Sequence, residues 1–359
     1  MFEILEKEIE ILNERLNSIK KYIIKNELEK RIIETKALEE FESIDLIEYR
    51  RLITEENKSP INYNAVIISL YGCYENFIDN ILIDFLDILA EIGIDYEKLD
   101  KSIISNHERL VGNFLSNTNR YKNYDLNTKD IINKLNGCIN GETNYKLNSR
   151  ILINHSGNLN IESINTLFNQ IGIKDIWNRV KNTNDFIDFY GLKENIKDRE
   201  SVKKFLIKDN DIIFNMINDL VERRNSVAHS WNEDTRVSNE ELREKYIPFI
   251  LIICKAIYRI LMEVIYNYLF ENNKLIKIQT IHNIYNNRIL CINSEENVIY
   301  VNDFIYIIRN QKKSLAKVEN IQIDHVNVEK CDEQQDIGLK LDTKINGADE
   351  IYIYKNGER

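Results

Sequence analysis

One short stretch of this 359-residue chain carries residue types suited to acid–base and phosphate chemistry. It reads VERRNSVAHSW and spans residues 221–231. Arg224 lies in register with an apolar series of helical spacing. The series is Ile213, Ile217, Leu220, Val227 and Trp231. The pattern predicts that Arg224 projects from the buried side of a helix, where a guanidinium is costly unless it is paired and hydrogen-bonded.

Glu75 is the candidate partner for Arg224. It lies in the apolar segment INYNAVIISLYGCYENFIDNILIDFLDILAEIG, residues 61–93, which predicts a core helix. At about 100° per residue, Glu75 falls at the edge of the apolar sector, beside Ile68 and Leu82. On spacing alone, the first interpretation is an Arg–Glu clamp that fixes the register of two helices. Catalysis is the second interpretation.

His229 supplies the acid–base group. It follows Arg224 by five residues, which is about 140° around a helix, and Asn225 lies one turn before it on the same side. A histidine near a helix end, with an amide one turn back and arginines close by, suits proton transfer, although an isolated histidine is more often packed or solvated. Helix geometry does not bring Arg224 and His229 together. A single site therefore needs a second subunit or a helix break near Ala228.

The string ERRNSVAHS resembles the R-x(4-6)-H motif of the HEPN superfamily of ribonucleases, in its bacterial RiboL-PSP-type branch. In that branch a motif like RRNxxAH ends a core helix. The upstream YGCYENFID resembles the first core helix, where an aromatic-rich segment carries an acid, here Glu75. The resemblance covers about residues 50–270. HEPN toxins with nucleotidyltransferase antitoxins often carry a tyrosine where this chain has Trp231, so that form of regulation is not expected.

The resemblance implies a helical bundle, usually dimerised through the two motif helices, that cuts RNA without a metal or another cofactor. The 2′-hydroxyl would attack the adjacent phosphate. His229 would move protons, and Arg224 would stabilise the charge that develops on the phosphate. Asn225 would orient the histidine or the phosphate, and Glu75 would position Arg224. Arg223 would add phosphate binding or remain a solvated surface charge.

From this resemblance we expect a metal-independent endoribonuclease that leaves 2′,3′-cyclic phosphate ends, in bacterial anti-phage defence or a toxin–antitoxin system. The expected partners are RNA, a second copy of the chain, and an antitoxin or defence-complex protein. The alternative is a non-catalytic HEPN subunit that binds RNA or acts as a scaffold. A metal enzyme is disfavoured because the other histidines lie without ligand spacing. They are His107, His155, His282 and His325.

The elements that must position these residues form a mainly α-helical fold. We expect a HEPN-like helical bundle over residues 1–270, with N-terminal helices in 1–58 and the motif helix at about 211–231. A heptad series from Phe2 to Ile23 predicts a helix that packs inside its own domain or against a second copy. The polar, Asn-rich residues 100–200 predict short helices and long loops.

The last helix and the C-terminal part have clear boundary signals. Ser238-Asn239-Glu240-Glu241 is a capping box that opens a long helix to about Phe270, with a kink or break near Pro248. From 271 to 359, period-two runs such as LIKIQTI, NVIYV and EIYIY predict a small antiparallel β domain. Target recognition, partner docking and a purely structural role all remain open for it.

Composition limits the setting of this chemistry. A net charge of −10 argues against coating nucleic acid through bulk charge and favours a selective RNA substrate. Five cysteines without a CxxC pair argue against structural zinc. The start, MFEILEKEIEIL, shows no signal segment. The apolar stretch 249–270 carries a polar stripe of Lys255, Arg259, Glu263 and Asn267, which indicates an amphipathic core helix. We expect a cytoplasmic protein without a membrane partner.

Overall fold

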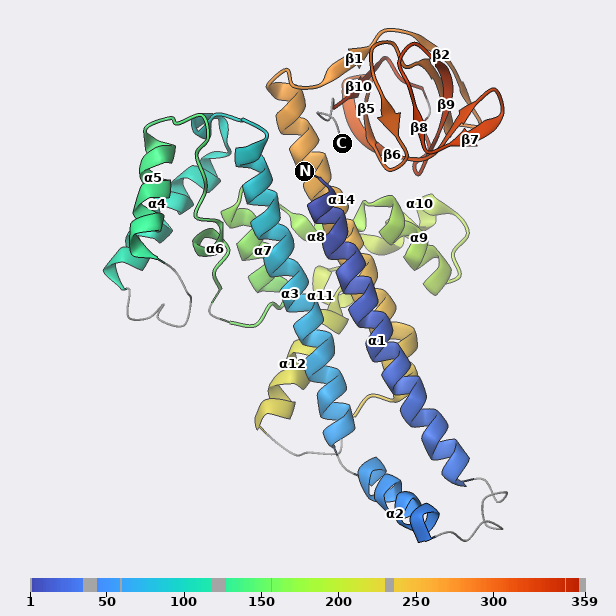
Figure 1. Ribbon diagram of the computed structural model, residues 1–359. Helices are drawn as coiled ribbons and strands as arrows, with labels where there is room; N and C mark the ends of the chain where they lie inside the picture. The colour runs from blue at the N-terminus through green and yellow to red at the C-terminus, as the bar shows by residue number, and fades with distance from the viewer. Residues whose placement is uncertain are drawn as a thin grey trace. The chain divides into compact units, whose positions relative to one another are not determined.

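A computed structural model describes residues 2–34, 44–58, 60–117, 127–155, 157–229, 236–345 and 347–354 (Figure 1). Its contacts divide the chain into two compact units, residues 1–260 and 261–359, and each is described by itself. The first unit is helical and the second is mostly antiparallel sheet, which confirms the predicted fold class. The division falls inside the last long helix, before the domain boundary predicted at residue 270.

Two long helices, α1 (Glu3–Glu34) and α3 (Ile61–Glu91), lie side by side in the helical unit, and α2 (Ile44–Lys58) contacts both (Figure 1). The seam of α1 is buried, because Leu5, Leu12, Leu16 and Ile23 are each at most 2% exposed. The heptad series therefore packs inside its own unit, which was the first of the two interpretations.

Helix α3 is the central core helix. Its apolar side chains are buried over most of its length, including Ile67, Leu70, Ile78 and Ile81. Among the described helices, α3 has the length and composition to cross a membrane, but 56% of its most apolar window is buried. Such burial fits a helix at the centre of a folded bundle.

Short helices fill the region that the sequence predicted as short helices and loops. They are α4 (Lys101–Ser116), α5 (Thr128–Ile139), α6 (Ser149–Leu152), α7 (Ile161–Gln170), α8 (Ile176–Lys181), α9 (Asn184–Lys193) and α10 (Arg199–Leu206). Asn160 caps α7 by accepting a hydrogen bond from Ser163 N at 2.8 Å. Ser149 of α6 donates to Asp87 Oδ1 of α3 at 2.5 Å, and this bond ties the start of α6 to the core helix.

The motif segment forms two helices, α11 (Asn210–Ile213) and α12 (Asn215–His229), and the prediction of one continuous helix was wrong at Phe214. The break lets Phe214 bury its ring fully, 4.4 Å from the ring centroid of Trp177. Tyr190 donates a hydrogen bond at 2.7 Å to the Ile213 carbonyl at the break. Residues 230 and 231 lie outside the described residues.

The last helical segment is continuous through α13 (Asn239–Glu241), a π-helical turn η4 (Leu242–Tyr246) and α14 (Ile247–Glu271). Ser238 caps it by accepting a hydrogen bond from Glu241 N at 3.1 Å, as the capping box predicts. The irregularity expected near Pro248 is the π-helical turn just before it. Because proline has no N–H to donate back into the helix, a widened turn at this point accommodates it.

The C-terminal unit is a curled antiparallel sheet. Its strands are β1 (Ile276–Ile278), β2 (Ile281–Tyr285), β3 (Ile289–Asn293), β4 (Ile299–Tyr300), β5 (Phe304–Arg309), β6 (Lys312–Ile323), β7 (Val326–Val328), β8 (Lys330–Cys331), β9 (Asp336–Leu341) and β10 (Glu350–Ile353). The order is β1-β10-β5-β6-β9-β3-β2, β7 extends β6, and β4 pairs with β8. Consecutive strands β1 and β2 lie at opposite ends of this order, so the sheet curls around its own apolar core.

Candidate functional site

Helix α12 packs on α3, and residues from both helices and from the loop after α6 line one pocket of about 780 Å³. The lining residues are Glu75, Asn76, Asp79, Asn80 and Ile83 of α3, Arg150, Ile153, Asn154, His155, Gly157 and Asn158 of α6 and its loop, and Arg224 and Asn225 of α12. The structure therefore brings three of the predicted residues together. They are Glu75, Arg224 and Asn225.

Tyr71 connects the predicted acid to the predicted arginine. The Arg224 guanidinium carbon lies 5.4 Å from the centroid of the Tyr71 ring, a cation–π distance. The Tyr71 hydroxyl donates to Glu75 Oε1 at 2.8 Å and accepts from Leu159 N at 3.0 Å. No ion pair within 4.0 Å joins Arg224 to Glu75 in the part of the chain that the structure describes. The expected direct clamp is thus corrected to a clamp through Tyr71.

The electrostatics of Tyr71 support this role. Burial raises the pKa of its hydroxyl well above the ordinary value, and the neighbouring Glu75 carboxylate raises the pKa further. The Leu159 N–H and Arg224 act in the opposite direction without cancelling this effect. The hydroxyl therefore stays protonated at neutral pH and remains a donor to Glu75.

Asn225 is held by two donors. Its Oδ1 accepts from Asn158 Nδ2 at 2.7 Å and from Arg224 Nη1 at 3.3 Å. Since the amide oxygen is occupied, Asn225 would present its NH₂ group to a ligand in the pocket. That group suits an acceptor such as a phosphate oxygen or another oxyanion.

Arg223 is not a solvated surface charge, since its side chain is only 19% exposed, and its role in phosphate binding stays a prediction. Its Nε and Nη2 bond both carboxylate oxygens of Asp219 at 2.6 and 3.0 Å, and Nη1 donates to the Tyr63 hydroxyl at 3.2 Å. Tyr246 also bonds Asp219. Burial lowers the pKa of Arg223, but these bonds more than offset it and the pKa is raised. Arg223 is a positioning residue that fixes α12 against α3 and η4.

His229 is the last residue of α12, and its side chain lies outside what the structure describes. Its role in proton transfer stays a prediction. The backbone of α12 runs without a break through Ala228, so a helix break does not bring His229 toward Arg224. A site that contains both residues therefore still requires the other expected route, a second subunit.

The pocket holds charged residues that the sequence analysis did not select. His155 Nε2 lies 3.1 Å from Asp79 Oδ1, its Nδ1 lies 2.7 Å from the Gly157 carbonyl oxygen, and Arg150 lines the same pocket. One signal pointed to Asp79, because it lies four residues after Glu75 on the polar side of the segment 61–93. No local pattern predicted that the loop carrying His155 would meet that face.

The residues that the structure describes contain no group of three or more His, Cys, Asp or Glu side chains suited to a metal ion.

The motif helix, the core helix with its tyrosine–glutamate pair and the pocket between them define a HEPN-type helical domain. A family model described as RiboL-PSP-HEPN matches residues 10–263, and the chain belongs to this family. Domains of this type are commonly ribonucleases or RNA-binding modules. A search of curated proteins found no match to the chain.

Proposed function

We propose that this chain is a metal-independent endoribonuclease of HEPN type and that the pocket between α3 and α12 is part of its active site. The observation that carries the proposal is the common position of the motif residues Arg224 and Asn225 with Glu75 around one open pocket. A motif that served only helix packing would not need to border an open pocket lined by charged side chains and amides.

The proposed reaction is a transesterification within RNA. The ribose 2′-oxygen attacks the adjacent phosphorus while its proton is taken up, and the bond from phosphorus to the 5′-oxygen breaks as that oxygen gains a proton. The products carry a 2′,3′-cyclic phosphate and a 5′-hydroxyl. His229 moves these protons, Arg224 stabilises the negative charge on the phosphate oxygens, and Asn225 donates a hydrogen bond from its NH₂ group.

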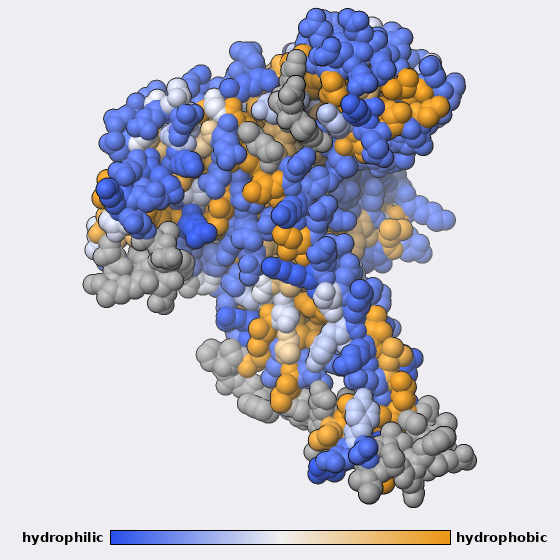
Figure 2. All heavy atoms as spheres, in the orientation of Figure 1, coloured by the Kyte–Doolittle hydropathy of each residue, from blue (hydrophilic) through white to orange (hydrophobic). Residues whose placement is uncertain are grey.

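We also propose that the active form is a homodimer through the motif helices. Ile61, Ile68 and Glu75 recur every seven residues and lie along one line of α3. Ile61 is 61% exposed and Ile68 is 52% exposed, and hydrophobic side chains are visible on this end of α3 (Figure 2). An exposed apolar line that continues into the pocket suits a second copy, which would complete the site with its own His229.

The biological setting that we propose is bacterial anti-phage defence or a toxin–antitoxin system, with an antitoxin or defence-complex protein that restrains the nuclease. Membership of the RiboL-PSP-HEPN family supports this setting. Growth arrest on expression of the wild-type chain, relieved by His229→Ala, tests it. Unimpaired growth with active wild-type enzyme would count against a toxin.

A non-catalytic RNA-binding or scaffold subunit is the second candidate. It would use the same pocket to hold RNA and the same helices to dimerise. An open pocket is compatible with binding alone, whereas intact Arg224, Asn225 and His229 favour catalysis.

The deciding experiment is cleavage of labelled total tRNA and a structured RNA in EDTA. Wild-type protein is compared with His229→Ala and with His282→Ala, a matched control in the C-terminal unit. We expect cutting by the wild type and by the control, with 2′,3′-cyclic phosphate ends, and none by His229→Ala. RNA binding without cutting by any of the three would favour the scaffold.

A further inference from the structure

The hydrogen bonds of His155 determine its protonation state. Its Nε2 faces a carboxylate oxygen of Asp79 at 3.1 Å, and its Nδ1 faces the carbonyl oxygen of Gly157 at 2.7 Å. Both partners are acceptors in their ordinary ionisation states, so both ring nitrogens must carry a hydrogen to satisfy them. The geometry therefore describes a positively charged imidazolium that is only 21% exposed.

His155 changes the sign of the charge in the pocket. The charged and titratable groups that share the pocket with it are Asp79 and Glu75 on α3, Arg150 on α6 and Arg224 on α12. With His155 protonated, three cations face two carboxylates and the pocket is net positive. With His155 neutral, the charges balance and the electrostatic attraction for a phosphodiester is lost.

Deprotonation also affects the loop that carries His155. A neutral ring can donate from one nitrogen only, so the bond to Asp79 or the bond to Gly157 must be given up. The same loop holds Asn158, which donates to Asn225 Oδ1 at 2.7 Å. Loss of a proton would therefore loosen a contact to the motif residue as well as remove a charge.

We propose that His155 is a third cation of the RNA-binding pocket and that its protonation makes RNA binding depend on pH. This proposal rests on the proposed function in one respect, which is that the pocket between α3 and α12 receives RNA. His155 acts through charge and through the loop, since both of its N–H groups are already engaged, and it is a positioning residue.

The direction of the titration follows from the surroundings. The hydrogen bond to Asp79 raises the pKa of His155, burial lowers it, and the Gly157 carbonyl and the Glu75 carboxylate raise it further, so that the pKa lies above the ordinary value for histidine. The ring therefore keeps its proton to a higher pH than an ordinary histidine does. RNA affinity should be high below this pKa and should fall as the pH rises through it.

The test measures binding, so that it is independent of cleavage. Full-length His229→Ala protein serves as the common background, because it removes the other histidine assigned to the site and leaves the RNA uncut. Fluorescence anisotropy with a labelled single-stranded RNA is recorded from about pH 6 to about pH 8.5, a range that brackets the titration of histidine. Three proteins are compared: the background itself, the background with His155→Gln, and the background with His282→Gln.

His282 is a matched control because it also pairs with an aspartate, at 2.9 Å from Asp336, in the C-terminal unit. We expect the Kd of the background to rise by about tenfold across the range. This rise corresponds to a change of about one unit in the pKa of His155 when RNA binds. The Kd of the His155→Gln protein should change less than about twofold over the range, and His282→Gln should behave like the background.

A second variant separates charge from folding. Asp79→Asn removes the carboxylate that raises the pKa of His155, so the midpoint of the pH dependence should move to lower pH while the dependence itself persists. A pH dependence that is unchanged by His155→Gln would overturn the proposal, and so would a failure of the background protein to bind RNA at any pH. If the wild type cut no RNA but its RNA binding still depended on His155, the nuclease proposal would be wrong. The proposal for His155 would still hold.

Discussion

At the residue scale, Tyr71 couples the acid to the arginine of the proposed active site. Its ring lies under the Arg224 guanidinium and its hydroxyl bonds Glu75. The ring makes a cation–π contact, and the hydroxyl makes hydrogen bonds. A variant that keeps the ring and removes the hydroxyl therefore separates the two hydrogen bonds, to Glu75 and from Leu159, from the contact with Arg224.

We predict that Tyr71→Phe lowers the rate of RNA cleavage by about tenfold, the loss expected when a positioning contact of about 1.4 kcal/mol is removed. It should also lower the free energy of unfolding by about 1–3 kcal/mol, because the Leu159 N–H loses its buried acceptor. Single-turnover cleavage and urea unfolding measure the two effects.

Tyr352→Phe is the control, since Tyr352 donates to Glu350 at 2.8 Å in the other unit. This variant should cleave RNA at the wild-type rate. Equal cleavage rates for Tyr71→Phe and wild type would show that the Tyr71 hydroxyl does not contribute to catalysis.

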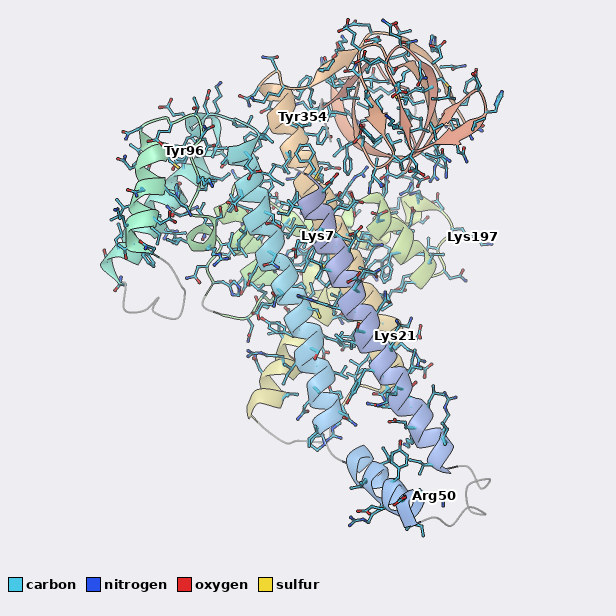
Figure 3. The ribbon with its side chains drawn as sticks, viewed as in Figure 1. Lys7, Lys21, Arg50, Tyr96, Lys197 and Tyr354 are labelled. Atoms are coloured by element: carbon cyan, nitrogen blue, oxygen red, sulfur yellow. The ribbon has the colours of Figure 1, made fainter. Side chains whose placement is uncertain are left out.

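His107 is a buried histidine with a different purpose. It is fully buried, its Nε2 accepts from Asn148 N at 3.1 Å, and its Nδ1 lies 3.1 Å from the hydroxyl of Tyr96, the residue labelled in Figure 3. Nε2 is therefore unprotonated, and the neutral ring satisfies both contacts. Burial lowers the pKa of His107 to about 4.

This lowered pKa predicts a stability that depends on pH. The unfolded chain binds the His107 proton near the ordinary pKa of 6.5, whereas the folded protein binds it only near pH 4. The contribution is complete above about pH 6.5 and decreases as the pH falls, by about 3 kcal/mol at pH 4. Urea unfolding of wild type and His107→Gln at several pH values measures it. The variant should lack this part of the decline, and parallel curves would disprove the assignment.

At the scale of elements, α12 is held on α3 by a cluster of charged and phenolic groups. Asp219 receives two bonds from Arg223 and one from Tyr246, and Arg223 also bonds Tyr63 of α3. The side chains of Arg223 and Asp219 are only 19% and 35% exposed. Removing the carboxylate would leave a largely desolvated guanidinium without its counter-charge.

We predict that Asp219→Asn lowers the free energy of unfolding by about 1–3 kcal/mol, less than for a fully buried pair because solvent screens part of the interaction. It should also lower RNA cleavage, because the helix that carries Arg224 loses its anchor. Glu200→Gln is the control: its pair with Lys203 on α10 is exposed and should matter by less than about 1 kcal/mol. An Asp219→Asn protein as stable as the control would show that the cluster does not fix α12.

Local periodicity predicted the helices that carry the site. The apolar segment 61–93 became α3 with Glu75 half-buried at its edge, and the series around Arg224 became α12. The Ser238 cap and the strands after Asn273 were also predicted from the sequence, because each pattern lies within a few neighbouring residues. The family match over residues 10–263 supports the HEPN resemblance found in the motif.

Contacts between distant residues were not predictable in this way. Tyr71 and Leu159 meet across 88 positions, and His155 meets Asp79 across 76. The break at Phe214 arises because its ring packs on Trp177, a residue from another helix. A single sequence gives the faces of helices, but the pairing of a polar loop with one of those faces depends on the whole bundle.

At the scale of the whole molecule, the proposed dimer is the condition for a complete site. Five residues of unbroken helix separate Arg224 and His229 by about 140°, so one chain presents them in different directions. A twofold arrangement of α12 helices would bring the histidine of one copy toward the arginine of the other. The exposed Ile68, on the line of α3 that leads to Glu75, is the apolar residue best suited to that contact.

We predict that the protein sediments with about twice the 42.6 kDa mass of one chain. Ile68→Glu should shift it to the monomer and abolish cleavage, because a buried carboxylate at the contact is strongly unfavourable. Leu192→Glu, at a side chain that is 85% exposed on α9, should leave both properties unchanged. A wild type that is monomeric and fully active would contradict the dimeric site.

The measurement that tests the central claim most directly is cleavage of one defined RNA with and without a 2′-deoxy substitution at the mapped cut, in EDTA. We expect wild-type protein to cut the ribose form, to leave the deoxy form intact at that position, and to lose cutting of the ribose form on Arg224→Ala. Arg199→Ala, an arginine of α10 outside the pocket, should cut like the wild type. Cutting of the deoxy form, or undiminished cutting by Arg224→Ala, would contradict a ribonuclease site built on this pocket.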